Sequence, residues 1–278
     1  MTMNDNTTVP SDGVHTFDVR AFARTAQGTM RGEIDTAEYA GRRLPDDVLT
    51  VLRFLRDLEA STMAHLRNVL VTATHKDARV TAFLVSWAFE KFWIADAIET
   101  VLEANDESET VVQSHGAAVR RDRVEGPDRR GPVMRAISAM RIGTPIVAVH
   151  MASGLIDEWI TRAAYERAVE VAQSAELTRT VARLLGLKQR HSEFFEEEAR
   201  RRLASTPRAA KLANRTLGHI AWPLGSIDKS DETRAFFERF AFGGAEGVAR
   251  AGAIERGIAS LPGITAAVAR DIRERLVP

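Results

Sequence analysis

The stretch VARLLGLKQRHSEFF, residues 181–195, decides the fold prediction for this chain. Its apolar residues recur every three or four positions, which is the spacing of one face of an α-helix. Lys188 and His191 fall on that apolar stripe. A charge on a buried stripe is costly unless it is paired or bound to a metal. The stretch therefore predicts a helix whose charged residues find partners on neighbouring helices.

Three further segments of the chain show the same helical periodicity. The expected long helices cover residues 46–73, 77–103, 133–173 and 175–205. Pro45 followed by two aspartates is a good helix start, and Pro145 is expected to kink or divide the third helix. No segment alternates with the two-residue period of a strand, so we predict an all-α fold.

The remaining segments frame these helices. Residues 1–14 are expected to be a disordered lead and residues 15–43 to hold a short helix, which together form an N-terminal region 1–45. Residues 104–132 are polar and carry a weaker helix signal than their neighbours. The four long helices make up region 46–205. Residues 206–278 are expected to be shorter helical pieces packed on it, broken at Trp222-Pro223, Gly243-Gly244 and Pro262-Gly263.

Each long helix places one charged residue on its apolar stripe. Glu59 and Glu90 are 31 positions apart, and Glu158 and Lys188 are 30 apart. The two halves of the helical region therefore share one layout. Four such residues at similar levels indicate that their charges meet in the core, although a half-buried carboxylate taken singly is more often capped by water or arginine.

This spacing resembles the di-iron ferritin-like superfamily, in which Glu is followed about 30 residues later by Glu-x-x-His, twice. The likeness is closest to the acyl carrier protein desaturases and covers about residues 46–205. Their fourth helix carries a run similar to Lys188-Gln189-Arg190-His191-Ser192-Glu193, with Glu in place of Lys188. Their third helix has a Glu-x-x-Thr like Glu158 to Thr161. The resemblance implies a four-helix bundle with a long crossover between helices 2 and 3.

The resemblance also implies a metal site, iron or manganese. Glu59 would be the terminal carboxylate of one metal, Glu158 that of the other, Glu90 the bridge and His191 a ligand of the second metal. Thr161 or Tyr165 would lie near an oxygen-activating centre. An apolar, fatty-acid-like substrate is the class that the desaturase likeness implies, and ferritin-like proteins are often dimers.

Two ligand positions depart from the family pattern. Trp93 stands where a histidine is expected, and Lys188 stands where a carboxylate is expected. We hypothesise that the Lys188 ammonium replaces one metal ion and pairs with Glu59 and Glu90, while Glu158, Glu90 and His191 hold a single metal. This reading predicts an oxidoreductase. The rival is a metal-free, non-catalytic protein in which a buried Lys-Glu network fixes the bundle of a binding or structural module.

Composition excludes several other classes. The 278 residues have a net charge of zero, which gives no general attraction to nucleic acid. The chain has no cysteine, so it has no disulfide, thiolate metal ligand or cysteine nucleophile. The longest uncharged stretch, residues 142–156, is shorter than the ~20 residues of a membrane span. These features lead us to expect a cytoplasmic protein without a membrane span.

Overall fold

The computed structural model describes residues 16–105 and 143–278. Within these two ranges the secondary structure is helical and includes no strand, as the periodicity predicted. The α-helices are α1 (Val19–Arg24), α2 (Thr36–Gly41), α3 (Asp46–Leu70), α4 (Ala78–Ala104), α7 (Pro145–Ala172), α8 (Ala175–Ser205), α9 (Pro207–Leu217), α10 (Asp231–Phe242), α11 (Gly244–Ala259) and α12 (Ala266–Leu276). Short 3-10 turns, η1 (Arg31–Glu33), η2 (Ala73–Lys76) and η4 (Ser226–Asp228), lie between them.

Local capping interactions set the helix ends. The side chain of Ser174 accepts a hydrogen bond from the Leu177 backbone N–H at the start of α8, and Asp77 does the same for Val80 at the start of α4. Such caps satisfy N–H groups that have no partner within the helix. Pro145 occupies the first turn of α7, where its missing N–H costs nothing. It begins the helix, and Gly143 and Thr144 before it are not helical.

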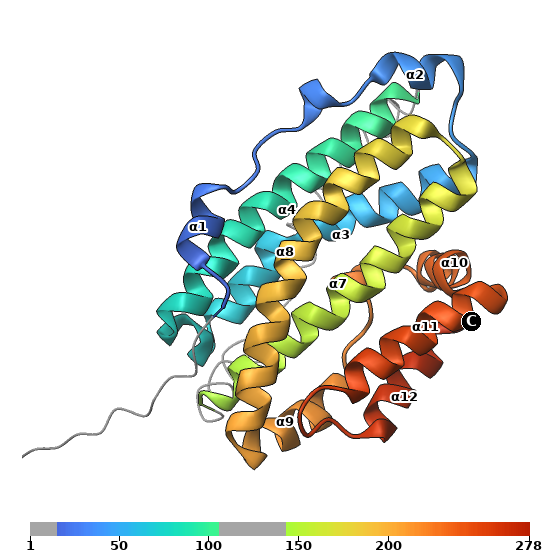
Figure 1. The fold of residues 1–278 in the computed structure, drawn as a ribbon. Coiled ribbons are helices and arrows are strands. Elements are labelled where there is room, and N and C mark those ends of the chain that lie inside the picture. The colour runs from blue at the N-terminus through green and yellow to red at the C-terminus, as the bar shows by residue number, and fades with distance from the viewer. Residues whose placement is uncertain (1–15, 106–142) are drawn as a thin grey trace, which may run out of the picture.

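The four long helices, α3, α4, α7 and α8, pack side by side and form the core of the molecule (Figure 1). The chain connects α3 to α4 through η2, and α7 to α8 through a short turn at Gln173 and Ser174. The α7–α8 packing is close: a Cβ atom added at Gly154 would lie 2.5 Å from the Phe195 ring. Glycine is therefore required there for α7 and α8 to approach each other.

Two outer layers cover this core. The N-terminal strap, residues 16–35, lies along α4 and α8, and its Phe17 and Phe22 pack against Phe83 of α4. On the other side, the C-terminal helices α9, α10 and α11 pack on α7, and α12 packs on α11 and α9 (Figure 1). The loop that contains Leu224 joins this layer to the core, because its backbone N–H donates to Asp157 at 2.7 Å.

The described helices agree closely with the sequence-based ranges. The predicted fourth helix, 175–205, is confirmed as α8, and the expected breaks at residues 222–223, 243–244 and 262–263 separate the C-terminal pieces. The expected short helix within 15–43 is resolved into α1, η1 and α2. The expected disordered lead, the polar connection 104–132 beyond its first residues and the predicted helical residues 133–142 lie outside the described residues.

Candidate functional site: a buried ion network

Two lysines and two glutamates meet at the centre of the four long helices. Lys188 of α8 pairs with Glu158 of α7 at 2.5 Å and with Glu59 of α3 at 3.1 Å. Lys91 of α4 also pairs with Glu59, and it lies 3.5 Å from Glu158. All four side chains are buried. Each carboxylate is therefore shared by two ammonium groups, and each long helix contributes one charge.

The pKa values show which force dominates in this network. Burial alone would raise the pKa of Glu59 and Glu158, but the ammonium groups of Lys188 and Lys91 outweigh it and hold both pKa values below the usual range. Burial would likewise lower the pKa of Lys91, yet the carboxylates of Glu158 and Glu59 raise it. The pairing therefore favours the charged form of these groups in the core.

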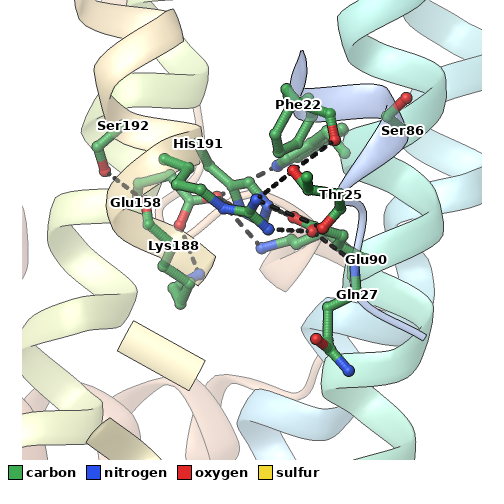
Figure 2. Close-up of polar contacts among 12 residues, drawn as sticks. Phe22, Thr25, Gln27, Ser86, Glu90, Glu158, Lys188, His191 and Ser192 are labelled. Atoms are coloured by element: carbon green, nitrogen blue, oxygen red, sulfur yellow. Dashed lines mark hydrogen bonds and ion pairs between the residues drawn. The ribbon is translucent and has the colours of Figure 1, made fainter. Parts of the chain in front are cut away.

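Glu90 forms the second part of the site, beside the lysine pair. Its Oε1 accepts hydrogen bonds from Arg190 at 2.5 Å and from the backbone N–H of Gln27 at 2.8 Å. Its Oε2 contacts Nε2 of His191 at 2.7 Å. Figure 2 shows Glu90 enclosed between α8 and the N-terminal strap. This carboxylate is fully buried and fully partnered.

His191 joins the two parts of the site. While Nε2 faces Glu90, Nδ1 lies 3.5 Å from Oε1 of Glu158. Two further donors complete the surroundings: the Tyr165 hydroxyl donates to Glu59 at 3.1 Å and the Trp87 indole N–H donates to Glu158 at 3.3 Å. Burial and then the charge of Glu59 raise the pKa of Tyr165 well above its usual value, so Tyr165 keeps its proton and remains a donor.

The charges of this network balance. Three carboxylates face three cationic side chains: Glu59, Glu90 and Glu158 against Lys91, Lys188 and Arg190. In a di-metal site of the resembled family, the carboxylates instead offset two divalent cations. Here ammonium and guanidinium groups already supply the compensating positive charge.

The residues do not fit a di-metal centre in this arrangement. The carboxylate oxygens that would bind metal are occupied by Lys91, Lys188 and Arg190. A divalent ion would add two positive charges to a buried site that is already neutral, at a large desolvation cost. Across residues 16–105 and 143–278, no three His, Asp or Glu side chains are grouped so that they could hold a metal ion.

A small cavity of about 20 Å³ adjoins the network on its α3 side. A volume of this size holds about one ordered water. Asp157 lines it beside Lys91 and Thr161, and burial raises the pKa of Asp157 to about 7 even though Lys91 opposes the shift. Asp157 is thus a buried carboxyl that titrates near neutral pH.

The predicted site residues come together only in part as expected. Glu59, Glu90, Glu158, Lys188 and His191 do meet in the core. The expected pairing of Lys188 with Glu90 is wrong, because the ammonium bridges Glu59 and Glu158, while Arg190 takes Glu90. Whether any of these residues binds metal stays a prediction.

Of the three residues predicted as catalytic, Lys188 lies in the ion network, and Thr161 and Tyr165 differ in their surroundings. Tyr165 belongs to the network through its hydrogen bond to Glu59. Thr161 lines the cavity, but its hydroxyl donates locally to the backbone carbonyl of Asp157 at 2.8 Å. Trp93 is half-buried, packs against the hydrophobic core and contacts the rings of Phe89 and Phe92.

Sequence reasoning missed Lys91 and Arg190. A signal for Lys91 was available, because the chain has only five lysines and Lys91 lies four positions after Trp87 on an apolar stripe. Arg190 gave no comparable signal, since one side of α8 carries several arginines. Both residues supply cations that the metal hypothesis assigned to metal ions.

Comparisons with known proteins found no match from which a role for this site could be taken. The chain matches no protein-family model, and neither the curated proteins nor the solved structures contain a match to it. Among the described helices, none combines the length and apolar character that crossing a membrane requires. The described residues thus form packed long helices with a network of three carboxylates and three cationic side chains at their centre.

Proposed function

We propose that this protein is a metal-independent member of the ferritin-like group that works as a binding or structural module. The observation that supports this reading is the double contact of Lys91 and Lys188 with Glu59 and Glu158. The lysine side chains take the places that cations would hold between the carboxylates. The network then fixes the relative positions of the four long helices without a metal or a redox step.

Charge accounting favours this proposal over a metal enzyme. Metal binding at Glu59 or Glu158 would require a lysine to lose its proton or leave the core. The raised pKa of Lys91 opposes the first route. The close packing around the buried Lys188 opposes the second. Specific buried ion pairs can set which elements pair and in what register, which is the role proposed here.

A second candidate is a mononuclear metal enzyme that uses Glu90, Glu158 and His191 and acts on an apolar substrate. One observation favours it: the His191 ring lies between the two carboxylates, at 2.7 Å and 3.5 Å. Metal binding there would require Arg190 and the strap at Gln27 to release Glu90. The rearrangement makes this candidate the weaker one.

Elemental analysis of protein purified without chelator tests the two candidates. We expect far less than one metal ion per chain, and no change in thermal stability when Fe(II), Mn(II) or EDTA is added. The double variant Lys91→Met/Lys188→Glu removes both ammonium groups and adds a fourth carboxylate. We expect it to take up metal and to be stabilised by it, since a ligand that binds only the folded state raises stability.

The opposite pattern would support the enzyme. About one tightly held metal per wild-type chain, lost in His191→Ala, would contradict the metal-independent proposal. The matched control is Lys211→Glu, because Lys211 is exposed on α9 and far from the network in sequence. Metal uptake by that variant as well would point to nonspecific binding.

A further inference from the structure

A groove runs between α7 and α11, where the C-terminal layer packs on the core (Figure 1). Trp159 of α7 lies beside Gly257 of α11. Further along α7, Glu170 pairs with Arg250, which precedes Gly257 on α11, so the two helices are antiparallel. One stripe of each helix forms one wall of the groove. The walls consist of Trp159, Arg162, Ala163 and Glu166 on α7, and of Arg250, Ala253, Ile254 and Gly257 on α11.

Small residues keep this groove open. Ala163, Ala253 and Gly257 have little or no side chain, so the two walls do not fill the space between them. At Gly257 the indole ring of Trp159 occupies that space, because a Cβ atom added to the glycine would lie 2.9 Å from the ring. Trp159 therefore closes one end of the groove and gives it an aromatic wall.

The volume and lining of the groove fit one small aromatic ring. The groove measures about 220 Å³. An apolar cavity of about 150 Å³ accepts benzene, so the groove has room for a ring and one small substituent. Ile254 and the two alanines supply apolar contacts. Trp159 adds a ring against which an aromatic ligand packs more favourably than an aliphatic one.

Arg162 gives the groove a cation that is only loosely paired. Its Nη2 donates to the neutral amide oxygen of Gln189 at 2.8 Å. Its Nη1 lies 3.9 Å from Glu166, which is beyond hydrogen-bond distance. The Glu166 side chain is 45% exposed, so this ion pair contributes little. The Arg162 guanidinium can therefore donate to a carboxylate that enters the groove, which is the group that arginine binds best.

Arg250, the second arginine of the groove, is already paired. Its Nη2 contacts the two carboxylate oxygens of Glu170 at 2.6 Å and 2.5 Å. The groove thus offers one loosely paired guanidinium, and this suits a ligand with a single negative charge better than a dianion such as a phosphate ester.

We propose that the groove between α7 and α11 binds a small aromatic monocarboxylate, with its ring between Trp159 and Ala253 and its carboxylate on Arg162. This gives the chain a ligand class that the ion network does not supply. Ligand binding in the groove and metal independence of the network can fail separately, because no residue of the network lines the groove.

Isothermal titration calorimetry of the full chain with phenylacetate tests this site. We expect one site per chain with a Kd on the order of 0.1–1 mM, a range suited to a ligand of about ten non-hydrogen atoms. Phenylacetamide keeps the ring but has no charge, and we expect it to bind at least about 10-fold more weakly. Hexanoate keeps the carboxylate without a ring and is expected to bind about 3-fold or more weakly.

Two variants locate the ligand, each with a matched control. Ala253→Leu fills the groove and is expected to abolish binding, whereas Ala249→Leu makes the same change on α11 outside the groove and is expected to leave the Kd unchanged. Arg162→Gln is expected to weaken phenylacetate binding at least about 10-fold. Its control is Arg273→Gln on α12, because the two arginine side chains are 29% and 32% exposed and each faces one glutamate loosely.

Circular dichroism of each variant shows whether its helices are intact, and Arg162→Gln decides the test if Ala253→Leu does not fold. Absence of saturable binding to the wild-type protein up to about 10 mM phenylacetate would overturn the proposal. Undiminished binding in Ala253→Leu would place the ligand elsewhere and overturn it too. Equal affinity for phenylacetamide would contradict the role of Arg162, and equal affinity for hexanoate would contradict the aromatic class.

Discussion

At the scale of single residues, the carboxylates of the ion network share their cationic partners: each of Glu59 and Glu158 contacts both Lys91 and Lys188. Removing one lysine therefore leaves two buried carboxylates with only one ammonium group to balance their negative charge. An unpaired buried charge costs more than its pair contributes, because the desolvation penalty remains. The network is thus sensitive to single changes and tolerant of matched ones.

Lys188→Met tests this sensitivity, since methionine keeps most of the lysine chain length but has no charge. We expect the free energy of unfolding to fall by about 3–5 kcal/mol, as measured by urea denaturation. Lys211→Met, the same change at an exposed position, is expected to stay within about 0.5 kcal/mol of wild type.

The double variant Lys188→Met/Glu158→Gln completes the cycle. The double variant removes both partners of the ion pair and leaves neither charge unpaired. Its loss in free energy of unfolding is therefore expected to be smaller than the sum of the losses in the two single variants, by on the order of 1–3 kcal/mol. Additive costs would mean that Lys188 and Glu158 do not interact in solution.

The sequence predicted the carboxylates of this site better than its cations. Glu59, Glu90 and Glu158 each stand out as the charge on an apolar stripe. Lys91 follows Glu90 directly, and neighbouring helix residues point about 100° apart. Both are buried because α3 covers one flank of α4 while α8 and the strap cover the other. A prediction that assigns a single buried face to α4 can include Glu90 or Lys91 but not both, and for this reason Lys91 was not predicted.

At the scale of secondary-structure elements, local signals carried most of the prediction. The bounds of α8 follow from Ser174 at its start and Thr206-Pro207 at its end, and both signals can be read from neighbouring residues. The packing of α7 on α8 could not be read in this way. It depends on Gly154 facing Phe195, and nothing in the local sequence of either residue indicates the other.

Two glycine substitutions compare these effects. Gly154→Ala places a methyl group 2.5 Å from the Phe195 ring and is expected to destabilise the protein by about 1–3 kcal/mol through overpacking. Gly186→Ala, in the exposed middle of α8 with nothing within 4 Å, is expected to stabilise it by about 0.5–1 kcal/mol. Thermal or urea unfolding measures both, and equal signs would contradict the close α7–α8 contact.

At the scale of the whole molecule, the core is held from two sides by chain segments distant in sequence. The strap reaches Glu90 through Gln27, and the C-terminal layer reaches Asp157 through Leu224. Hydrophobic periodicity predicted that helices exist in both regions, but it carries no information about which core residue each one contacts. Those contacts arise from single backbone N–H groups, which every residue except proline possesses.

Asp157 makes the stability of the whole chain depend on pH. Its pKa is about 7 in the folded state against an ordinary value of 3.8 for an aspartate side chain in water, so the folded state binds its proton more tightly. Protonated Asp157 therefore contributes to the free energy of unfolding. This contribution is fully present below about pH 4 and is lost as pH rises to about 7. Asp157→Asn removes this loss and still offers an oxygen to Leu224.

We therefore expect Asp157→Asn to be more stable than wild type at pH 8, by on the order of 2–4 kcal/mol. The difference is expected to approach zero near pH 4. Urea denaturation across this pH range measures it. A difference that does not change with pH would show that Asp157 is ionised in both states.

The contact between the strap and Glu90 has a consequence for mutational tolerance. The donor is the main-chain N–H of residue 27, and the Gln27 side chain takes no part in that bond. Nearly any amino acid at this position can therefore donate this hydrogen bond to the Glu90 carboxylate, and only proline would remove the donor. Related chains could therefore differ at residue 27 and still keep the hydrogen bond to Glu90. A search for invariant side chains would overlook this donor.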